Sequence, residues 1–250
     1  MNDLKYDIVT AADRPDLMNL VTEVTAKAWP EFMLHDPVAA LFTRLYADLP
    51  NQQFAFMESG TDRIIVLGNT VSLAWHYEPS ELSDTGWDWA MQSGIDDHDA
   101  GRTPTVLCAL QIVVAREFQG RGLSRTAVET MRSLARRMNL KSLIAPVRPS
   151  SKANHPLVPM EEYIHWKDDN GLPSDPWMRV HARCGGQIVK TCHQAMKISG
   201  TVAEWEEWTG MRFPRSGKHI VPGALVPVDI DLEVDRGLYI EPNVWMHHPL

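Results

Sequence analysis

The stretch from Thr105 to Met138 constrains the fold of this 250-residue chain more than any other part. Nearly every residue from Val106 to Val114 is apolar, with Gln111 as the strongly polar exception. Such a run is typical of a central strand that is covered on both faces. After Gly122, apolar residues recur at helical spacing, at Ala127, Met131, Leu134, Ala135 and Met138. The pattern predicts a buried strand, a glycine turn and a helix packed on a sheet.

The turn between this strand and helix, Gln119 to Ser124, has the properties of an anion site. The first N–H groups of a helix have no partner within the helix, so here they face the turn. Gly120 and Gly122 allow positive φ and leave the backbone open to a phosphate. The helix dipole favours negative charge by on the order of 0.3–1 kcal/mol per exposed charge. The turn therefore predicts a diphosphate site, with Arg121, Ser124 and Arg125 as supplementary donors.

This stretch resembles the coenzyme A binding motif of the GNAT superfamily of acyl-CoA-dependent N-acyltransferases. The motif has Gln or Arg, two free positions, Gly, one free position, and Gly or Ala, and the chain has Gln119, Gly122 and Ser124 at its three fixed places. Ser124 departs from the usual small apolar residue, and Arg116 stands where the family often has proline. In the order of its elements the resemblance covers roughly residues 6 to 197, but it is specific only from Leu107 to Met138.

The resemblance implies an α/β fold with a mixed, mostly antiparallel twisted sheet, helices on both faces and a split between two central strands. The strand at 142–147 would be the parallel partner of the strand at 106–114. We expect one domain over residues 1–250, with an inserted loop at 148–173 and a C-terminal elaboration at 200–250. The loop is longer than the connections usual in compact domains, which indicates a functional or lid-like segment.

Two local features refine this expectation. Between Arg63 and Trp75, Gly68-Asn69 predicts a hairpin turn that joins two strands. The polar segment from Pro79 to Arg102 contains the run Asp96-Asp97-His98-Asp99, which favours a solvated loop or helix end over a metal site. The segment is also a candidate wall of an acceptor pocket.

The resemblance also implies the cosubstrate, which is acetyl-CoA or another acyl-CoA. Two segments are expected to bind it. The N–H groups at the end of the central strand would meet the thioester carbonyl, and the turn with the start of the helix would hold the diphosphate. These residues are Val113, Val114, Gln119, Gly120, Arg121, Gly122, Leu123, Ser124 and Arg125.

The implied reaction is direct transfer of the acyl group, with acetyl as the expected group, to a small-molecule amine. Family members commonly carry a tyrosine in a late helix, four residues before a Gly-Phe pair. Here His181 has that spacing before Gly185, and Gly186 replaces the phenylalanine. A histidine of ordinary pKa near 6.5 could move the proton at the reacting centre, and Tyr163 and Glu162 are the alternatives. A histidine that merely packs on its helix is an equal reading of the same residue.

Composition excludes several other classes of protein. Hydrophobic residues make up 44% and charged residues 22%, and no apolar run approaches the roughly 20 residues of a membrane span. The N-terminus does not read as a signal peptide, so a cytoplasmic protein is expected. The net charge of −8 argues against nucleic acid. Three cysteines without CxxC spacing indicate neither a disulfide framework nor zinc, and no metal is expected. A homodimer is one option for the assembly.

Two other readings of the sequence stay open. The first is a non-catalytic acyl-CoA-binding or sensing module, because Gln111 stands where many relatives place an acidic base and the family's tyrosine is missing. The second is an unrelated α/β enzyme with a phosphate-bearing ligand on the same turn. Abundant ionisable residues in the loop at 148–173 favour an enzyme, since a binding module has little need of them.

Overall fold

The computed structural model describes residues 4–26 and 28–250, and residues 22 and 23 by their backbone alone. A nine-stranded sheet runs through these residues in the order β1-β2-β3-β4-β5-β9-β8-β7, and β6 also pairs with β9. Every pairing is antiparallel except β4 with β5. The strands are β1 (Tyr6–Thr10), β2 (Phe54–Glu58), β3 (Ile64–Leu73), β4 (Val106–Val114), β5 (Ser142–Val147), β6 (Gln187–Gly200), β7 (Gly217–His219), β8 (Val228–Asp231) and β9 (Arg236–Pro249).

Helices cover both faces of this sheet. They are α1 (Leu17–Ala26), α2 (Phe42–Asp48), α3 (Gly86–Asp99), α4 (Leu123–Arg137), α5 (Met160–Tyr163), α6 (Pro176–Arg183) and α7 (Val202–Thr209). The short 3-10 helices are η1 (Glu31–His35), η2 (Pro37–Leu41), η3 (Pro50–Gln52), η4 (Pro79–Glu81), η5 (Arg116–Phe118) and η6 (Lys152–Asn154). Across the described ranges, none of the helices is both long and apolar enough to cross a membrane.

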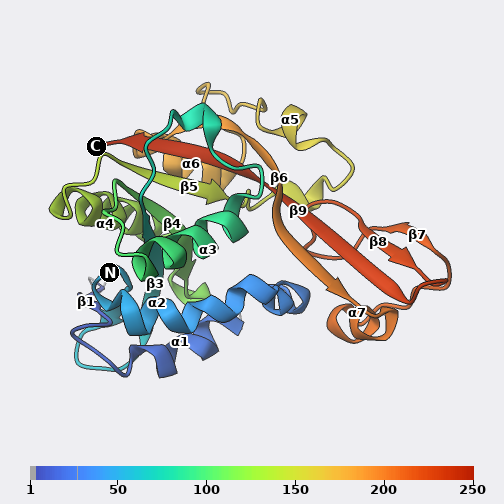
Figure 1. Cartoon of the computed structure of the whole chain (residues 1–250), viewed down its shortest axis with the longest axis horizontal. Coiled ribbons are helices and arrows are strands. Elements are labelled where there is room, and N and C mark those ends of the chain that lie inside the picture. The colour runs from blue at the N-terminus through green and yellow to red at the C-terminus, as the bar shows by residue number, and fades with distance from the viewer. Residues whose placement is uncertain (1–3, 27) are drawn as a thin grey trace.

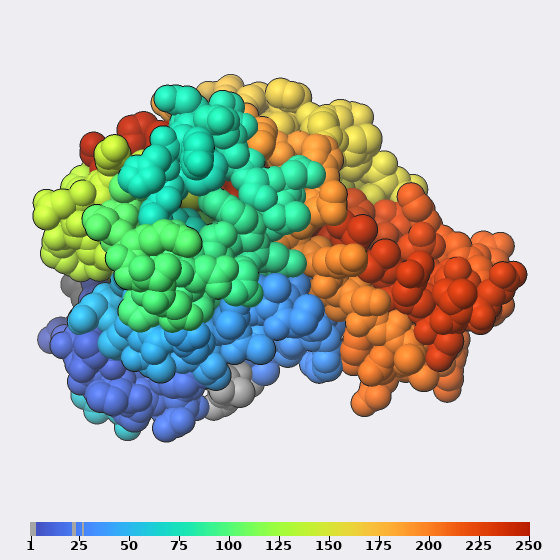
Figure 2. Space-filling view, viewed as in Figure 1, coloured from blue at the N-terminus to red at the C-terminus, as the bar shows by residue number. Residues whose placement is uncertain are grey.

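Two hydrophobic cores result, one on each face of the sheet. The first core takes Leu17 of α1, Leu45 of α2 and Met91 of α3. The second core takes Met131 of α4 and Met178 of α6. The long strands β6 and β9 leave the body together and carry β7, β8 and α7 in a lobe (Figure 1), which projects in the space-filling view (Figure 2). The predicted fold class, a mixed and mostly antiparallel sheet with helices on both faces, is confirmed.

The sheet is split at its centre. β4 and β5 pair only from Val106–Cys108 with Ser142–Ile144. Beyond these residues β4 continues to Val114 beside β3, and β5 continues to Val147 beside β9. The two parallel strands therefore share three residues of pairing and then separate, as the sequence predicted.

The hairpin predicted at Gly68-Asn69 is wrong, because β3 is one continuous strand through both residues. Gly68 lies opposite Ile112 of β4, and a Cβ on Gly68 would lie 2.1 Å from Cζ of Phe54. The glycine is needed for close approach of the Phe54 ring rather than for a turn. Asn69 is fully buried, and its amide donates to the hydroxyl of Tyr46 at 2.9 Å.

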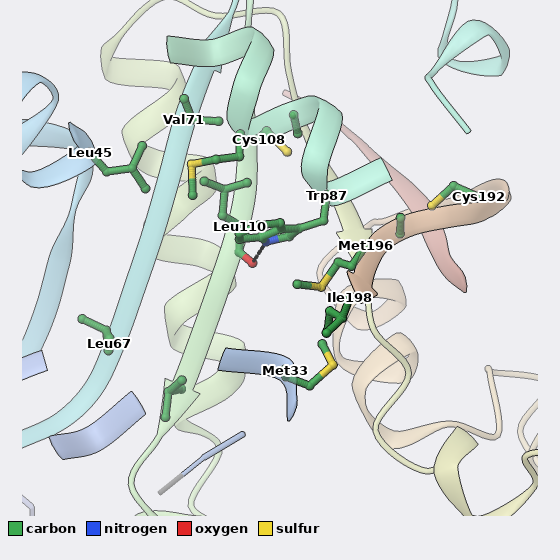
Figure 3. Packing of buried hydrophobic residues seen from close by; sticks show 14 of the residues in the cluster. Met33, Leu45, Leu67, Val71, Trp87, Cys108, Leu110, Cys192, Met196 and Ile198 are labelled. Atoms are coloured by element: carbon green, nitrogen blue, oxygen red, sulfur yellow. Dashed lines mark hydrogen bonds between the residues drawn. The ribbon is translucent and has the colours of Figure 1, made fainter. Parts of the chain in front are cut away.

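A β-bulge in β4 lies next to this position. Asn69 pairs with Gln111 and Thr70 pairs with Ala109, so Leu110 is an extra residue of β4. A bulge places two successive side chains toward one face of a sheet. The bulge is held by the indole Nε1 of Trp87, which donates to the carbonyl oxygen of Leu110 at 2.9 Å (Figure 3). Trp87 belongs to α3, and the run Asp96-Asp97-His98-Asp99 forms the end of this helix, one of the two settings that the sequence favoured.

The carboxyl groups of Asp36, which is buried, and Asp88, which is half-buried, lie next to each other. Asp36 accepts from the backbone N–H of Val38 at 2.8 Å, and Asp88 accepts from that of Lys197 at 3.2 Å. The two carboxyl groups also interact with each other. Burial, followed by the charge of Asp36, raises the pKa of Asp88 to about 8, and burial raises the pKa of Asp36 as well. The pair therefore holds a proton at neutral pH.

This pair predicts a stability that falls as pH rises. A carboxyl whose pKa is higher in the folded than in the unfolded state stabilises the fold at acid pH, and this stability is lost as pH rises toward the folded pKa of about 8. Asp88→Asn keeps a neutral partner for Asp36 at every pH. We expect it to raise the free energy of unfolding at pH 8 by about 1–2 kcal/mol and to change it little at pH 4.5.

Urea unfolding at the two pH values measures this difference. Asp229→Asn, at an exposed aspartate of β8, is the control and should change neither value. An Asp88→Asn protein that is no more stable than the wild type at pH 8 would refute the shared proton.

Candidate functional site

A cavity of about 1450 Å³ occupies the split between β4 and β5. Its wall includes residues 109–115 of β4 and its end, 145–148 of β5 and its end, and Trp177 of α6. It also includes Met33 and Trp87, which belong to the first core, whereas α6 packs in the second core on the other face of the sheet. The cavity thus passes through the sheet. It is larger than the roughly 300–1,000 Å³ usual for one small ligand, so it has room for two molecules that meet in the split.

One end of the cavity is the glycine turn before α4. Gly120 and Gly122 have φ of 75° and 78°, in the left-handed region, and no atom lies within 4 Å of a Cβ built on either residue. In the described part of the chain, the backbone N–H groups of residues 120–124 have no acceptor. The helix begins with the N–H of Arg125, which donates to the carbonyl oxygen of Gly122 at 3.0 Å. These free donors at a helix N-terminus favour an anion.

Most of the predicted coenzyme-binding residues line this cavity. Gln119 ties the turn to the strand, because its side-chain amide donates to the carbonyl oxygen of Val114 at 3.2 Å. The lining residues from the predicted set are Val113, Val114, Gln119, Gly120, Gly122, Leu123 and Ser124. Arg121 and Arg125 are exposed and lie outside the lining, although the guanidinium of Arg121 lies 5.5 Å from the ring of Phe118 at the turn.

The free backbone donor at the end of β4 is Val114. The N–H of Ala115 donates to the carbonyl oxygen of Ile65 at 2.9 Å, toward β3. Because N–H directions alternate along an antiparallel strand, the N–H of Val113 also faces β3 and that of Val114 faces the split. Val113 instead contributes its side chain to the first core. A carbonyl placed in the split would therefore meet the N–H of Val114.

His181 lies in α6 and lines the cavity. It is 1% exposed, its Nδ1 lies 2.9 Å from Nε2 of His248, and the ring of Trp177 lies 4.5 Å from its own. Burial, and then the neighbouring His248, lower the pKa of His181 to about 3, so the ordinary value expected from the sequence does not apply. Its imidazole is neutral near pH 7, and it can make hydrogen bonds without carrying charge.

Tyr163 and Glu162, the other two predicted catalytic residues, lie outside the cavity lining. The hydroxyl of Tyr163 donates to a carboxylate oxygen of Asp175 at 3.0 Å, and burial raises its pKa. Glu162 is exposed. Tyr163 packs beside Lys152, whose fully buried ammonium donates to the carbonyl oxygens of His155 and Leu225. From the inserted segment at 148–173, Arg148 and Ser150 line the cavity.

A buried ion pair that sequence reasoning missed lies on the far side of the split. Glu241 is fully buried and accepts from Nε of Arg148 at 2.9 Å, from the hydroxyl of Tyr239 at 2.8 Å and from the amide of Asn243 at 3.1 Å. Burial alone would lower the pKa of Arg148, but the Glu241 carboxylate and the Tyr239 hydroxyl together outweigh it, so the pKa is raised. The guanidinium lies 5.9 Å from the ring of Trp29. The two partners are 93 residues apart, and no local pattern joins them.

Gln111, the polar exception in the central strand, has partners in this region. Its side-chain oxygen accepts from the indole Nε1 of Trp29 at 3.2 Å, and its amide donates to Asn69 at 3.4 Å. The glutamine therefore fixes the wall of the cavity beside the bulge. Among the residues that the structure describes, no group of three or more His, Cys, Asp or Glu side chains is placed to hold a metal ion.

Known proteins resemble this chain in sequence and in fold. No family model matches the chain. The arginine N-acetyltransferase avaD of Aspergillus versicolor is 33% identical over 276 residues, which cover 98% of this chain and 94% of that protein. The loading GNATL domain of CurA from Lyngbya majuscula has a TM-score of 0.64 at 18% identity, with 98% of each chain covered. The GphF GNAT-like decarboxylase in complex with isobutyryl-CoA has a TM-score of 0.58 at 16% identity, with 97% of this chain and 98% of that chain covered. The two structures indicate the fold alone.

The pair of buried histidines predicts a loss of stability in acid. Burial lowers the pKa of His181 to about 3 and that of His248 to about 4, below the value near 6.5 of an unfolded chain. The unfolded state therefore binds more protons below pH 6.5, and the fold loses up to about 1.4 kcal/mol per histidine for each pH unit down to the folded pKa. The double variant His181→Asn/His248→Gln should show a flatter decline between pH 6.5 and 4.5.

Chemical denaturation at several pH values in this window provides the comparison. His98→Gln, at an exposed histidine of α3, should keep the wild-type slope. Parallel curves for the wild type and the double variant would contradict the buried neutral pair.

Proposed function

The chain belongs to the GNAT superfamily of acyl-CoA-dependent N-acyltransferases, and we propose that the acceptor of its acetyl group is a nitrogen of arginine. The relative that establishes the family is an arginine N-acetyltransferase, aligned over nearly the whole of both chains. The chain is accordingly an N-acetyltransferase that uses acetyl-CoA and acts on a small-molecule amine, as the sequence predicted. Arginine itself comes from the relative and is the part that needs a test.

The observation that carries the mechanism is the cavity that passes through the sheet. We place the coenzyme diphosphate on the free N–H groups of residues 120–124 and the pantetheine arm in the split along β4. The thioester carbonyl then lies beside the N–H of Val114, which would stabilise the negative charge that develops on this oxygen during attack. The acceptor enters from the opposite face, where Trp29, Gln111 and Arg148 line the cavity. Orientation of the two reactants in one passage favours direct transfer.

His181 is our candidate for the proton at the reacting centre, because of the three predicted residues only His181 lines the cavity. With its pKa lowered to about 3, the ring is a neutral hydrogen-bond partner at physiological pH. Such a ring can accept a proton from the attacking nitrogen only transiently. We therefore assign it the orientation of the acceptor nitrogen or the sulfur rather than storage of a proton. Tyr163 and Glu162 do not line the cavity, and the hydroxyl of Tyr163 is held by Asp175.

The expectation of an enzyme is confirmed by the relative, which excludes the non-catalytic reading. That reading relied on Gln111 in place of an acidic base. Gln111 is held by Trp29 and Asn69, so the glutamine has a structural reason to be there. The cytoplasmic location, the homodimer and the single domain with an inserted loop and a C-terminal elaboration remain proposals.

The turn before α4 yields a direct test of coenzyme binding. In Gly122→Trp the indole would project from an open position into the space of the diphosphate, so we expect acetyl-CoA to bind at least about tenfold more weakly. Gly101→Trp is the matched control, since Gly101 also has positive φ and open space but lies outside the cavity. Both variants carry the same backbone strain, on the order of 1–2 kcal/mol.

Isothermal titration calorimetry of the two variants separates a loss of the coenzyme site from the effect of backbone strain. Equal coenzyme affinity in folded Gly122→Trp and Gly101→Trp proteins would show that the turn does not bind the coenzyme.

The acceptor is tested by acetyl transfer to a panel of amines. We expect purified protein with acetyl-CoA to add 42 mass units to arginine, and tandem mass spectrometry to locate the acetyl group on one of its nitrogens. Lysine and ornithine are controls, since they have similar charge and length without a guanidino group. Transfer to either one in preference to arginine would exclude arginine as the acceptor and leave the N-acetyltransferase activity in place.

A further inference from the structure

The acceptor half of the cavity ends in a group of apolar side chains that no step of the reaction uses. These residues, which we call the acceptor chamber, are Met33, Phe42, Trp87, Leu110 and Met196. They come from η1, α2, α3, β4 and β6, and all pack in or against the first core, on the face of the sheet opposite α4. Figure 3 shows Met33, Trp87, Leu110 and Met196 grouped around the space between β4 and β6.

The chamber is built by the bulge in β4. As the extra residue, Leu110 projects toward the same face as Gln111, so the chamber wall continues directly from the Trp29–Gln111 contact. The hydrogen bond from Trp87 to the carbonyl oxygen of Leu110 fixes both residues. The rings of Phe42 and Trp87 lie 5.8 Å apart. The wall is thus held by backbone and ring contacts.

The chemistry of the chamber suits an apolar group. Met33, Trp87, Leu110 and Met196 keep 5–8% of their surface exposed, whereas Cys108 and Cys192 in the same core keep none. The exposed remainder faces the cavity, and two of these four side chains are methionines, which adapt to ligands of varied shape. Two charged residues of the lining, Arg148 and Glu241, pair with each other. A free charged or strongly polar group placed in this chamber would lose its hydration without gaining a partner.

The size of the passage points the same way. In the placement proposed above, the arm of the coenzyme lies along β4 and the turn, and the arginine part of the acceptor lies beside Trp29, Gln111 and Arg148. The chamber residues are further lining of the same 1450 Å³ cavity, and neither of these two parts covers them. A substrate part that fills the chamber gains the full hydrophobic free energy of burial.

We propose that the acceptor is an arginine derivative that carries a bulky aromatic or branched apolar substituent, and that this substituent binds in the acceptor chamber. The proposal rests on the proposed function for its arginine part. It assigns Met33, Phe42, Trp87, Leu110 and Met196 to substrate selection. The reactive nitrogen remains in the split, and the substituent sets how far the acceptor enters.

A matched pair of substrates tests this proposal on the wild-type enzyme. Arginine amide and arginine 2-naphthylamide both lack the free carboxylate and differ in the aromatic group. We expect kcat/KM to be at least about tenfold higher for the naphthylamide, since burial of an aromatic group favours binding by this much or more. Equal values, or a preference for the amide, would overturn the proposal.

Two variants locate the preference in the chamber. Met33→Ala and Met196→Ala should lower the ratio of the two kcat/KM values at least threefold, because each removes wall from the aromatic group. Met18→Ala is the control, since Met18 packs against the same core but lies outside the cavity lining, and it should leave the ratio unchanged. An unchanged ratio in both chamber variants would also overturn the assignment.

A second pair of amines separates this inference from the proposed acceptor. If no arginine compound is acetylated, 2-phenylethylamine and ethylamine take their place in the same assay. A strong preference for 2-phenylethylamine would retain the chamber and reject arginine. Equal use of the two amines would reject the chamber.

Discussion

The interrupted pairing of β4 and β5 is the constraint on which the rest of the structure depends. The strands share three paired residues, Val106–Cys108 with Ser142–Ile144, and then diverge. Backbone groups beyond that point lose a protein partner and need water or a ligand in its place. The N–H of Val114 is one such group, and it faces the split between the two strands. A sheet that closed fully would satisfy its backbone and would have no site.

Polar groups buried around the split keep it open. Gln111 and Asn69 bridge β4 and β3 at the bulge, and Arg148 and Glu241 join the end of β5 to β9. Each group is satisfied by a neighbour, as buried polar groups must be. These contacts hold the end of β4 against β3 and the end of β5 against β9. The two strand ends can therefore stay apart, although no backbone hydrogen bonds join them.

The same burial explains why the titration of the core departs from ordinary values. The histidine pair His181 and His248 is kept neutral, and the carboxyl pair Asp36 and Asp88 is kept protonated once. The histidine pair lowers the stability of the fold as pH falls, and the carboxyl pair lowers it as pH rises. The cause is the same, because burial disfavours the charged form of both kinds of group. Of these four residues His181 lines the cavity, and its neutral ring adds no charge beside a nucleophile that must attack as a neutral nitrogen.

Through the resemblance of its motif, the sequence implied the family and the split. By itself it determined the strand, turn and helix from Thr105 to Met138 and the two glycines with positive φ at the turn. These features are local, since side-chain periodicity and positive φ are encoded within a few residues. Tertiary structure alone decided that Gly68 meets the Phe54 ring inside one strand, that His181 pairs with a residue 67 positions away and that five separate elements form the acceptor chamber. Burial and pairing depend on residues that are distant in the chain, and no periodic pattern in one sequence records which of them will touch.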